Sequence, residues 1–181
     1  MKYQNLSEFS VPSQFRGKSK IIVQIWWMIQ NTLFSWSPQV LYGWRRLLLR
    51  AFGAKIGKNV LIRSTVKITY PWNVEIGDFS WIGEDCVLYS LGKITIGAHV
   101  AIAHKVYLNT GGHEYQKKTF DIFAKPLIIE DECWVTNDVY IAPGVRIGKG
   151  SVIGARSAVL QDIPSGKVCV GTPAKPIKNR L

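Results

Sequence analysis

Several features that would assign this chain to a common class are missing from its sequence. The chain has 181 residues but only three cysteines, Cys86, Cys133 and Cys169, and none of them forms a CxxC pair. Such sparse, unpaired cysteines indicate a reducing, cytoplasmic compartment. Residues 1–10 are polar, so we expect no signal peptide. The first apolar run, residues 21–36, is shorter than the ~20 residues that cross a bilayer, so we expect no transmembrane helix.

Acidic residues are scarce at both ends of the chain. Residues 1–55 hold eight basic groups and one acidic group, residues 56–165 hold eleven of each, and residues 166–181 hold four basic groups and no acidic one. The net charge of +11 therefore lies at the two ends. This distribution indicates anionic partners at two places. Because no recognition helix, RNP motif or zinc finger accompanies the charge, we do not expect nucleic-acid binding.

A six-residue period runs through most of the chain. Each unit starts with an aliphatic residue, often followed by glycine, and carries a small or β-branched residue at its fifth position. Ten units, taken in order, begin at Ile56, Ile62, Ile76, Ile82, Ile96, Ile129, Val135, Ile141, Ile147 and Ile153. This period is neither the 3.6 of a helix nor the 2 of a single strand. It predicts short strands joined by turns, with three units forming one coil of a triangular prism.

The repeat also predicts which side chains fill the prism. The first and fifth positions face inward, and glycine at the second position avoids a Cβ at a crowded corner. Cys86 and Cys133 occupy fifth positions, so we interpret them as interior space-fillers rather than redox groups. The segment at about 109–126 fits no repeat and is predicted to protrude as a loop, where functional residues often lie.

We divide the chain into an N-terminal helical segment (residues 1–52), a β-helix (residues 53–165) and a basic C-terminal tail (residues 166–181). Residues 19–34 and 38–52 are predicted to be helical, the second helix starting at Ser37-Pro38 and stopping at Gly53. Tryptophans crowd these helices and basic residues flank them. Two interpretations remain open, a cap on the prism and peripheral contact with an anionic membrane at the inner membrane face.

The C-terminal half carries four further motifs, Trp134-Val-Thr-Asn-Asp, Ala142-Pro-Gly-Val, Asp162-Ile-Pro and Gly171-Thr-Pro-Ala-Lys. Together with the repeats they resemble the left-handed parallel β-helix acyltransferases, over about residues 53–181. The similarity is greatest to the galactoside, maltose and polysaccharide O-acetyltransferases. The front end, Gly43-Trp-Arg-Arg and the following residues to Gly57, is similar to the colanic-acid-type enzymes. The resemblance implies an all-β, left-handed β-helix.

The resemblance also implies a homotrimer that transfers an acetyl group from acetyl-CoA directly to a sugar hydroxyl, with no metal. It places a general base at His113, in the protruding loop. A neutral imidazole can take the proton of a hydroxyl as it attacks a thioester. Positions that match the family's coenzyme-binding residues are Trp134, Asn137, Ala155, Lys175 and Lys178. The acceptor is expected to be an exopolysaccharide or its lipid-linked precursor.

Three alternatives remain open. A serine or an amino sugar could be the acceptor instead of a polysaccharide. A γ-type carbonic anhydrase uses the same prism with three histidines on zinc, and His99 and His104 have a suitable pair spacing. However, no histidine lies on an earlier coil to complete such a site. The third alternative is a scaffold that has kept the prism and lost catalysis.

Overall fold

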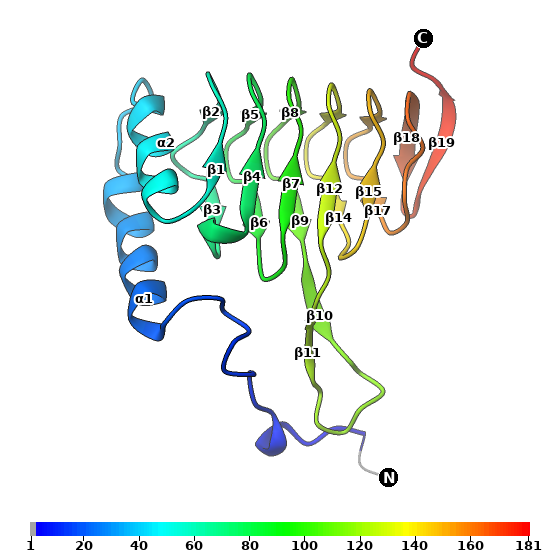
Figure 1. The fold of residues 1–181 in the computed structure, drawn as a ribbon. Helices are drawn as coiled ribbons and strands as arrows, with labels where there is room; N and C mark the ends of the chain where they lie inside the picture. Colours follow the sequence, from blue (N-terminus) through cyan, green and yellow to red (C-terminus); the bar gives the residue numbers. More distant parts are fainter. Residues whose placement is uncertain (1–2) are drawn as a thin grey trace.

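The computed structural model describes residues 3–181, which form a three-sided prism with helices at one end (Figure 1). Sheet A contains β1 (Lys55–Ile56), β4 (Val74–Ile76), β7 (Ile94–Ile96), β12 (Leu127–Ile129) and β15 (Arg146–Ile147). Sheet B contains β2 (Leu61–Ile62), β5 (Trp81–Ile82), β8 (Ala101–Ile102), β13 (Trp134–Val135), β16 (Val152–Ile153), β18 (Lys167–Gly171) and β19 (Ala174–Asn179). Sheet C contains β3 (Lys67–Ile68), β6 (Val87–Tyr89), β9 (Tyr107–Asn109), β14 (Tyr140–Ile141) and β17 (Ala158–Val159).

Neighbouring strands within each sheet are parallel and come from successive coils, as Ile62, Ile82 and Ile102 show by pairing in register. The exception is the last pair, β18 and β19, which is antiparallel. The basic C-terminal segment thus forms a hairpin on the edge of sheet B. The predicted β-helix of hexapeptide repeats is confirmed.

The core is the interior of the prism, filled by the first and fifth positions of the repeats. Ile62, Ile82 and Ile102 are at most 2% exposed, and Cys86 and Cys133 are at most 1% exposed. Burial raises the pKa of the Cys86 and Cys133 thiols to about 11 in each case. Both thiols therefore stay protonated at neutral pH, as expected for space-filling residues.

Where the second position is glycine, the neighbouring coil leaves no room for a side chain. A Cβ on Gly77 would lie 2.5 Å from the backbone nitrogen of Ala98, which is closer than packed atoms allow. The left-handed backbone of most corners falls instead on the fourth position, where Asn59 and His99, for example, have φ of 52° and 56°. The sequence prediction located the crowding correctly, but its cause is coil stacking rather than the bend of the corner.

The N-terminal helices close the first end of the prism (Figure 1). After the short turn η1 (Leu6–Glu8) come α1 (Lys20–Ile29), the π-helical turn η2 (Gln30–Phe34) and α2 (Tyr42–Ala51); η3 (Pro71–Asn73) lies within the β-helix. Trp26 on α1 donates from Nε1 to the carbonyl of Ile68, and Gln30 accepts from the Ile68 backbone N–H. These bonds satisfy backbone groups of sheet C at the open end. No helix in residues 3–181 is long and apolar enough to cross a membrane.

The predicted start of the second helix at Ser37-Pro38 is wrong, because α2 begins only at Tyr42. The cause is Arg45, which is fully buried and whose guanidinium donates to Ser37 Oγ, Pro38 O and Gln39 O. Those acceptors must curl around a charge that cannot reach water, so residues 37–41 form a turn. A buried cation needs such a set of partners.

The protruding segment is a β-hairpin made of β10 (Gly111–His113) and β11 (Ile122–Ala124). It leaves the prism after β9 of sheet C and returns at β12 of sheet A. Figure 1 shows it pointing away from the prism axis, with the N-terminal segment passing its tip. The predicted loop therefore has regular structure that can hold a side chain in a fixed position.

Candidate active site

His113 is the last residue of β10, and its imidazole contacts two aromatic rings. Its imidazole stacks on the ring of Phe120 at a centroid distance of 4.3 Å and an interplanar angle of 6°. Phe9 from the N-terminal segment meets the imidazole edge-on at 5.4 Å. These contacts, together with the partial burial of His113, fix the plane of the ring.

One hydrogen bond sets the tautomer of His113. Its Nδ1 lies 2.8 Å from the backbone oxygen of Phe120. A carbonyl oxygen only accepts, so Nδ1 carries the hydrogen and donates it. In the neutral ring Nε2 is then the unprotonated nitrogen, which is the form a general base needs.

The N-terminal segment also supports the tip of the hairpin. The backbone N–H of Asn5 donates to the carbonyl oxygen of Lys118 at 2.7 Å, and Phe9 follows four residues later against His113. Sequence reasoning missed both Phe9 and Phe120. No local pattern marks Phe9, because its contact joins segments more than one hundred residues apart.

A groove of about 560 Å³ runs over the outer face of sheet B. Its lining residues include Tyr42, Arg63, Trp81, Gly83, His99, His104, Trp134 and Arg180. The sixth positions of successive coils form a row on this face, in which Trp81, Ala101 and Trp134 pair in register. Two strand spacings separate the tryptophans, roughly 9–10 Å, and the small Ala101 lies between them. The indoles, 58% and 49% exposed, therefore flank a slot with an alanine floor.

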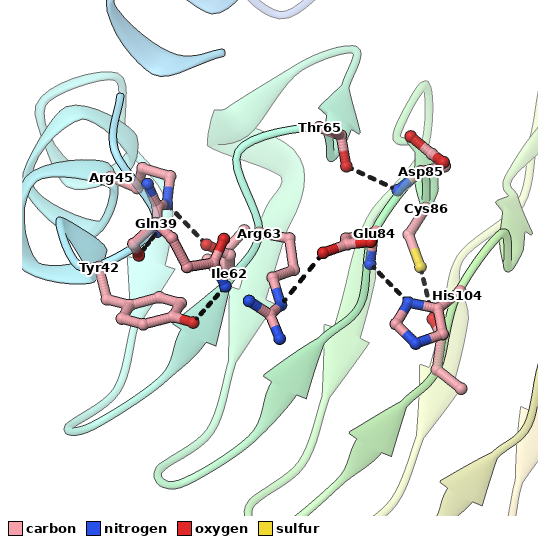
Figure 2. A network of polar contacts seen from close by, with 11 residues as sticks. Gln39, Tyr42, Arg45, Ile62, Arg63, Thr65, Glu84, Asp85, Cys86 and His104 are labelled. Atoms are coloured by element: carbon pink, nitrogen blue, oxygen red, sulfur yellow. Dashed lines mark hydrogen bonds and ion pairs between the residues drawn. The ribbon is translucent and has the colours of Figure 1, made fainter. Parts of the chain in front are cut away.

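Polar groups along the groove are held by neighbouring coils, and Figure 2 shows this network. His104 Nδ1 accepts from the backbone N–H of Glu84 at 3.3 Å, so its Nε2 carries the hydrogen in the neutral ring. The Glu84 carboxylate forms an ion pair with Arg63 at 3.9 Å. At the other end Arg180 donates to the carbonyl oxygens of Glu132 and Gly150. The groove thus offers both hydrogen-bond donors and acceptors between aromatic walls.

The five predicted coenzyme-binding residues lie on sheet B or at the corner between sheets B and C. The side-chain oxygen of Asn137 accepts a hydrogen bond from the backbone N–H of His104. The backbone carbonyl of Asn137 accepts one from the backbone N–H of Arg156, the residue directly after Ala155. Trp134 lies on the same sheet as β19. It pairs with Val152, Val152 pairs with Val168, and Val168 pairs with Lys178 on β19. Lys175 lies on the same strand. Sequence reasoning missed Trp81, although its sixth position in the repeat matches that of Trp134.

His113 is not brought to these residues within one chain. Its hairpin leaves the prism between sheets C and A, whereas the groove lies on sheet B. Among residues 3–181, those that line the groove do not include His113.

The histidine pair considered for zinc has other contacts. His99 stacks on Phe79 at 5.2 Å, and Nδ1 of His104 is occupied by the Glu84 N–H. In the part of the chain that the structure describes, no group of three His, Cys, Asp or Glu side chains could hold a metal ion. This finding alone does not decide the reaction.

Comparisons with known proteins assign the class. No protein-family model matches the chain. It is 56% identical over 98% of its length, and 98% of the relative's, to an Escherichia coli (strain K12) protein named colanic acid biosynthesis acetyltransferase WcaF. It is 33% identical to the galactoside O-acetyltransferase of the same strain, over 74% of this chain and 68% of that one. A hexapeptide-repeat acetyltransferase of Vibrio cholerae O1 biovar eltor, complexed with acetyl coenzyme A, superimposes with a TM-score of 0.80 at 25% identity, over 90% and 88% of the two chains.

The fold and these similarities define an acyltransferase of the hexapeptide-repeat class. The chain belongs to the hexapeptide-repeat acetyltransferase family, on its 56% identity to the Escherichia coli relative across nearly its whole length and its 33% identity to the galactoside O-acetyltransferase over 74% of the chain. The predicted family and enzyme class are thereby confirmed. Membership of this family, rather than the missing metal cluster, decides against the carbonic anhydrase alternative.

Proposed function

We propose that this enzyme transfers the acetyl group of acetyl-CoA to a hydroxyl of a saccharide used in exopolysaccharide synthesis. The relative at 56% identity carries a name from colanic acid biosynthesis, and a solved relative binds acetyl coenzyme A. The observation that carries the proposal is the Nδ1 contact of His113 with the Phe120 carbonyl, which leaves Nε2 free as a base. Both acetyl-CoA and three free thiols suit a reducing, cytoplasmic compartment.

In the proposed reaction His113 Nε2 removes the proton of the acceptor hydroxyl as its oxygen attacks the thioester carbon. A tetrahedral intermediate forms, and its C–S bond then breaks to release the CoA thiolate. The imidazolium returns the proton to the thiolate sulfur, so the histidine ends neutral. The donated hydrogen at Nδ1 stabilises the imidazolium during this step, because the Phe120 oxygen carries partial negative charge.

The groove on sheet B is the proposed substrate channel. Lys175 and Lys178 on β19 would meet the CoA phosphates, and Asn137 and Ala155 would meet the pantetheine arm at the adjoining corners. Trp134 and Trp81 would flank the reacting end, where flat apolar sugar faces pack against indoles. Arg63 and His104 would donate hydrogen bonds to acceptor oxygens from the same side.

We further propose a homotrimer in which the hairpin of one subunit reaches the groove of the next. This proposal is supported by the positions of His113 and the groove within one chain. His113 lies where the chain passes from sheet C to sheet A, whereas the groove lies on sheet B. A cyclic trimer of parallel prisms can place one subunit's corner against the next subunit's face at every interface.

Replacing His113 by alanine tests the proposal. His113→Ala should lower kcat by at least ~100-fold with acetyl-CoA affinity unchanged, as expected for loss of a general base. Lys117→Ala is the matched control, since Lys117 lies on the same hairpin in an exposed ion pair with Asp121. CoA thiol release would be followed with oligosaccharide, serine and amino-sugar acceptors. Full activity of His113→Ala would contradict the assignment, and turnover with serine alone would contradict the acceptor class.

A further inference from the structure

Helix α1 is apolar on two opposite sides. Its inner side contributes Val23 and Trp26, which are both 0% exposed. Its outer side carries Ile21, Ile25 and Met28 at i, i+4 and i+7, with exposures of 72%, 40% and 61%. A surface helix normally presents polar residues outward. The outer side of α1 therefore has the composition of a surface that is covered by a partner.

Further exposed apolar residues follow the end of α1 in the chain. Leu33 is 53% exposed, and Trp36 and Val40 in the turn before α2 are each 80% exposed. We call Ile21, Ile25, Met28, Leu33, Trp36 and Val40 the outer apolar face. It belongs to the helical end of the prism, away from the C-terminal hairpin (Figure 1). Exposed apolar patches of this kind mark interaction sites.

The surrounding charge is of one sign. From residue 9 to residue 74 the sequence has no aspartate or glutamate and ten lysines and arginines. Lys18 and Lys20, both exposed, stand at the start of α1, and Arg50 is exposed at the end of α2. A partner that covers this end must therefore be apolar in its interior and anionic at its rim.

We propose that the outer apolar face binds the surface of a lipid bilayer that contains anionic lipids. Ten residues of α-helix are too few to span a membrane, and residues 3–181 hold no candidate span. The helix would instead lie in the plane of the interface, with Ile25 and Met28 among the acyl chains. Trp36 suits the headgroup boundary, and Lys18 and Lys20 would meet lipid phosphates.

This inference deepens the proposed function and rests on it in one respect. In the proposed trimer of parallel prisms, all three helical ends point the same way, so three outer apolar faces would meet one membrane plane. Linked weak contacts of this kind reinforce one another. An enzyme held there would act on saccharides carried by a membrane lipid rather than on free sugars.

Vesicle sedimentation tests the proposal. The full-length protein is mixed with vesicles of phosphatidylcholine alone or with one quarter phosphatidylglycerol, at low and at raised salt. We expect at least about tenfold stronger binding to the anionic vesicles at low salt, and loss of most of that preference at raised salt. Equal recovery with both vesicle types, or no binding to either, would overturn the proposal.

Two kinds of variant separate the apolar and the charged contributions. Met28→Glu should reduce anionic-vesicle binding about tenfold or more, and Lys18→Gln with Lys20→Gln should reduce it mainly at low salt. Leu160→Glu is the matched control, because Leu160 is 52% exposed and directly follows β17, the strand of sheet C farthest from the helical end. Equal losses from Met28→Glu and Leu160→Glu would overturn the assignment.

The same variants reveal whether another copy of the chain covers this face instead. Light scattering in solution should give the same mass for Met28→Glu as for the natural protein. A smaller mass would make the face a subunit interface and overturn the membrane assignment. Acetyl-CoA binding in solution, measured without vesicles, reports on the proposed function separately.

Discussion

At the scale of single residues, the Phe120 carbonyl determines which nitrogen of His113 can act as a base. The same imidazole is positioned by two phenylalanines from distant parts of the chain, Phe9 and Phe120. An imidazole that stacks on one ring and meets a second ring edge-on has little freedom to rotate. If His113 is the base as proposed, its Nε2 is oriented before substrate arrives, which lowers the entropic cost of reaching the reactive geometry.

Phe9 is accordingly expected to be a positioning residue. Phe9→Ala should lower kcat by about tenfold, because small displacements of a base are costly, while KM for acetyl-CoA stays unchanged. Phe9→Tyr keeps the ring and should restore most of the loss. Steady-state kinetics provide the measurement, with thermal unfolding as a control for global stability. A change in KM with kcat intact would contradict this role.

At the scale of elements, the coils stack so closely at Gly77 that a side chain at this second repeat position has no room. Gly77→Ala places a Cβ 2.5 Å from the Ala98 nitrogen, and we expect a loss of about 1–3 kcal/mol in the free energy of unfolding. Gly43→Ala is the control, since Gly43 lies in α2 and its added Cβ would come no closer than 3.8 Å to any neighbour. That change should raise stability by about 0.5–1 kcal/mol.

Urea unfolding of the two variants measures both changes. Similar stabilities for Gly77→Ala and Gly43→Ala would contradict the stacking explanation.

The elements also show what the sequence could and could not predict. The β-helix was predictable because inward positions such as Ile62 and Cys86 recur at a fixed period, and the period alone excludes helix and simple strand. The start of α2 was not predictable, because Ser37-Pro38 is a good local helix start, but the buried Arg45 takes hydrogen-bond acceptors from Ser37, Pro38 and Gln39 and holds them in a turn. Local signals describe a segment, whereas a buried charge imposes its own surroundings.

Some residues of the candidate site could likewise be predicted from the sequence, and others could not. His113 and Trp134 could be proposed as site residues from the resemblance to the acyltransferase family, and the place of His113 in the single long insertion supports its choice. The partner of His113 could not be predicted, because a backbone carbonyl such as that of Phe120 leaves no signature in the side-chain sequence. The slot between Trp81 and Trp134 depends on strand register across three coils.

At the scale of the whole molecule, a site divided between subunits makes a quantitative prediction. His113→Ala removes the base, and Ala101→Trp fills the slot in the groove, so each variant alone should be inactive. Random mixed trimers of the two should recover activity in about one quarter of the sites, where an intact hairpin meets an intact groove. Activity would be measured after the mixed subunits are unfolded and refolded together. No recovery, with mixed trimers present, would contradict a shared site.

The distribution of charge has a separate role at this scale. The helical end is proposed for a lipid surface and the C-terminal hairpin for CoA phosphates, with a neutral prism between them. Both ends are therefore expected to bind less tightly as salt rises, but through different residues.

The most direct test of the central claim is calorimetric titration of the purified protein with acetyl-CoA. We predict saturable binding near one site per subunit, equal affinity for His113→Ala, and weaker, less salt-dependent binding when Lys175 and Lys178 are both changed to alanine. An absence of binding by the natural protein at low salt would contradict an acetyl-CoA-dependent transferase.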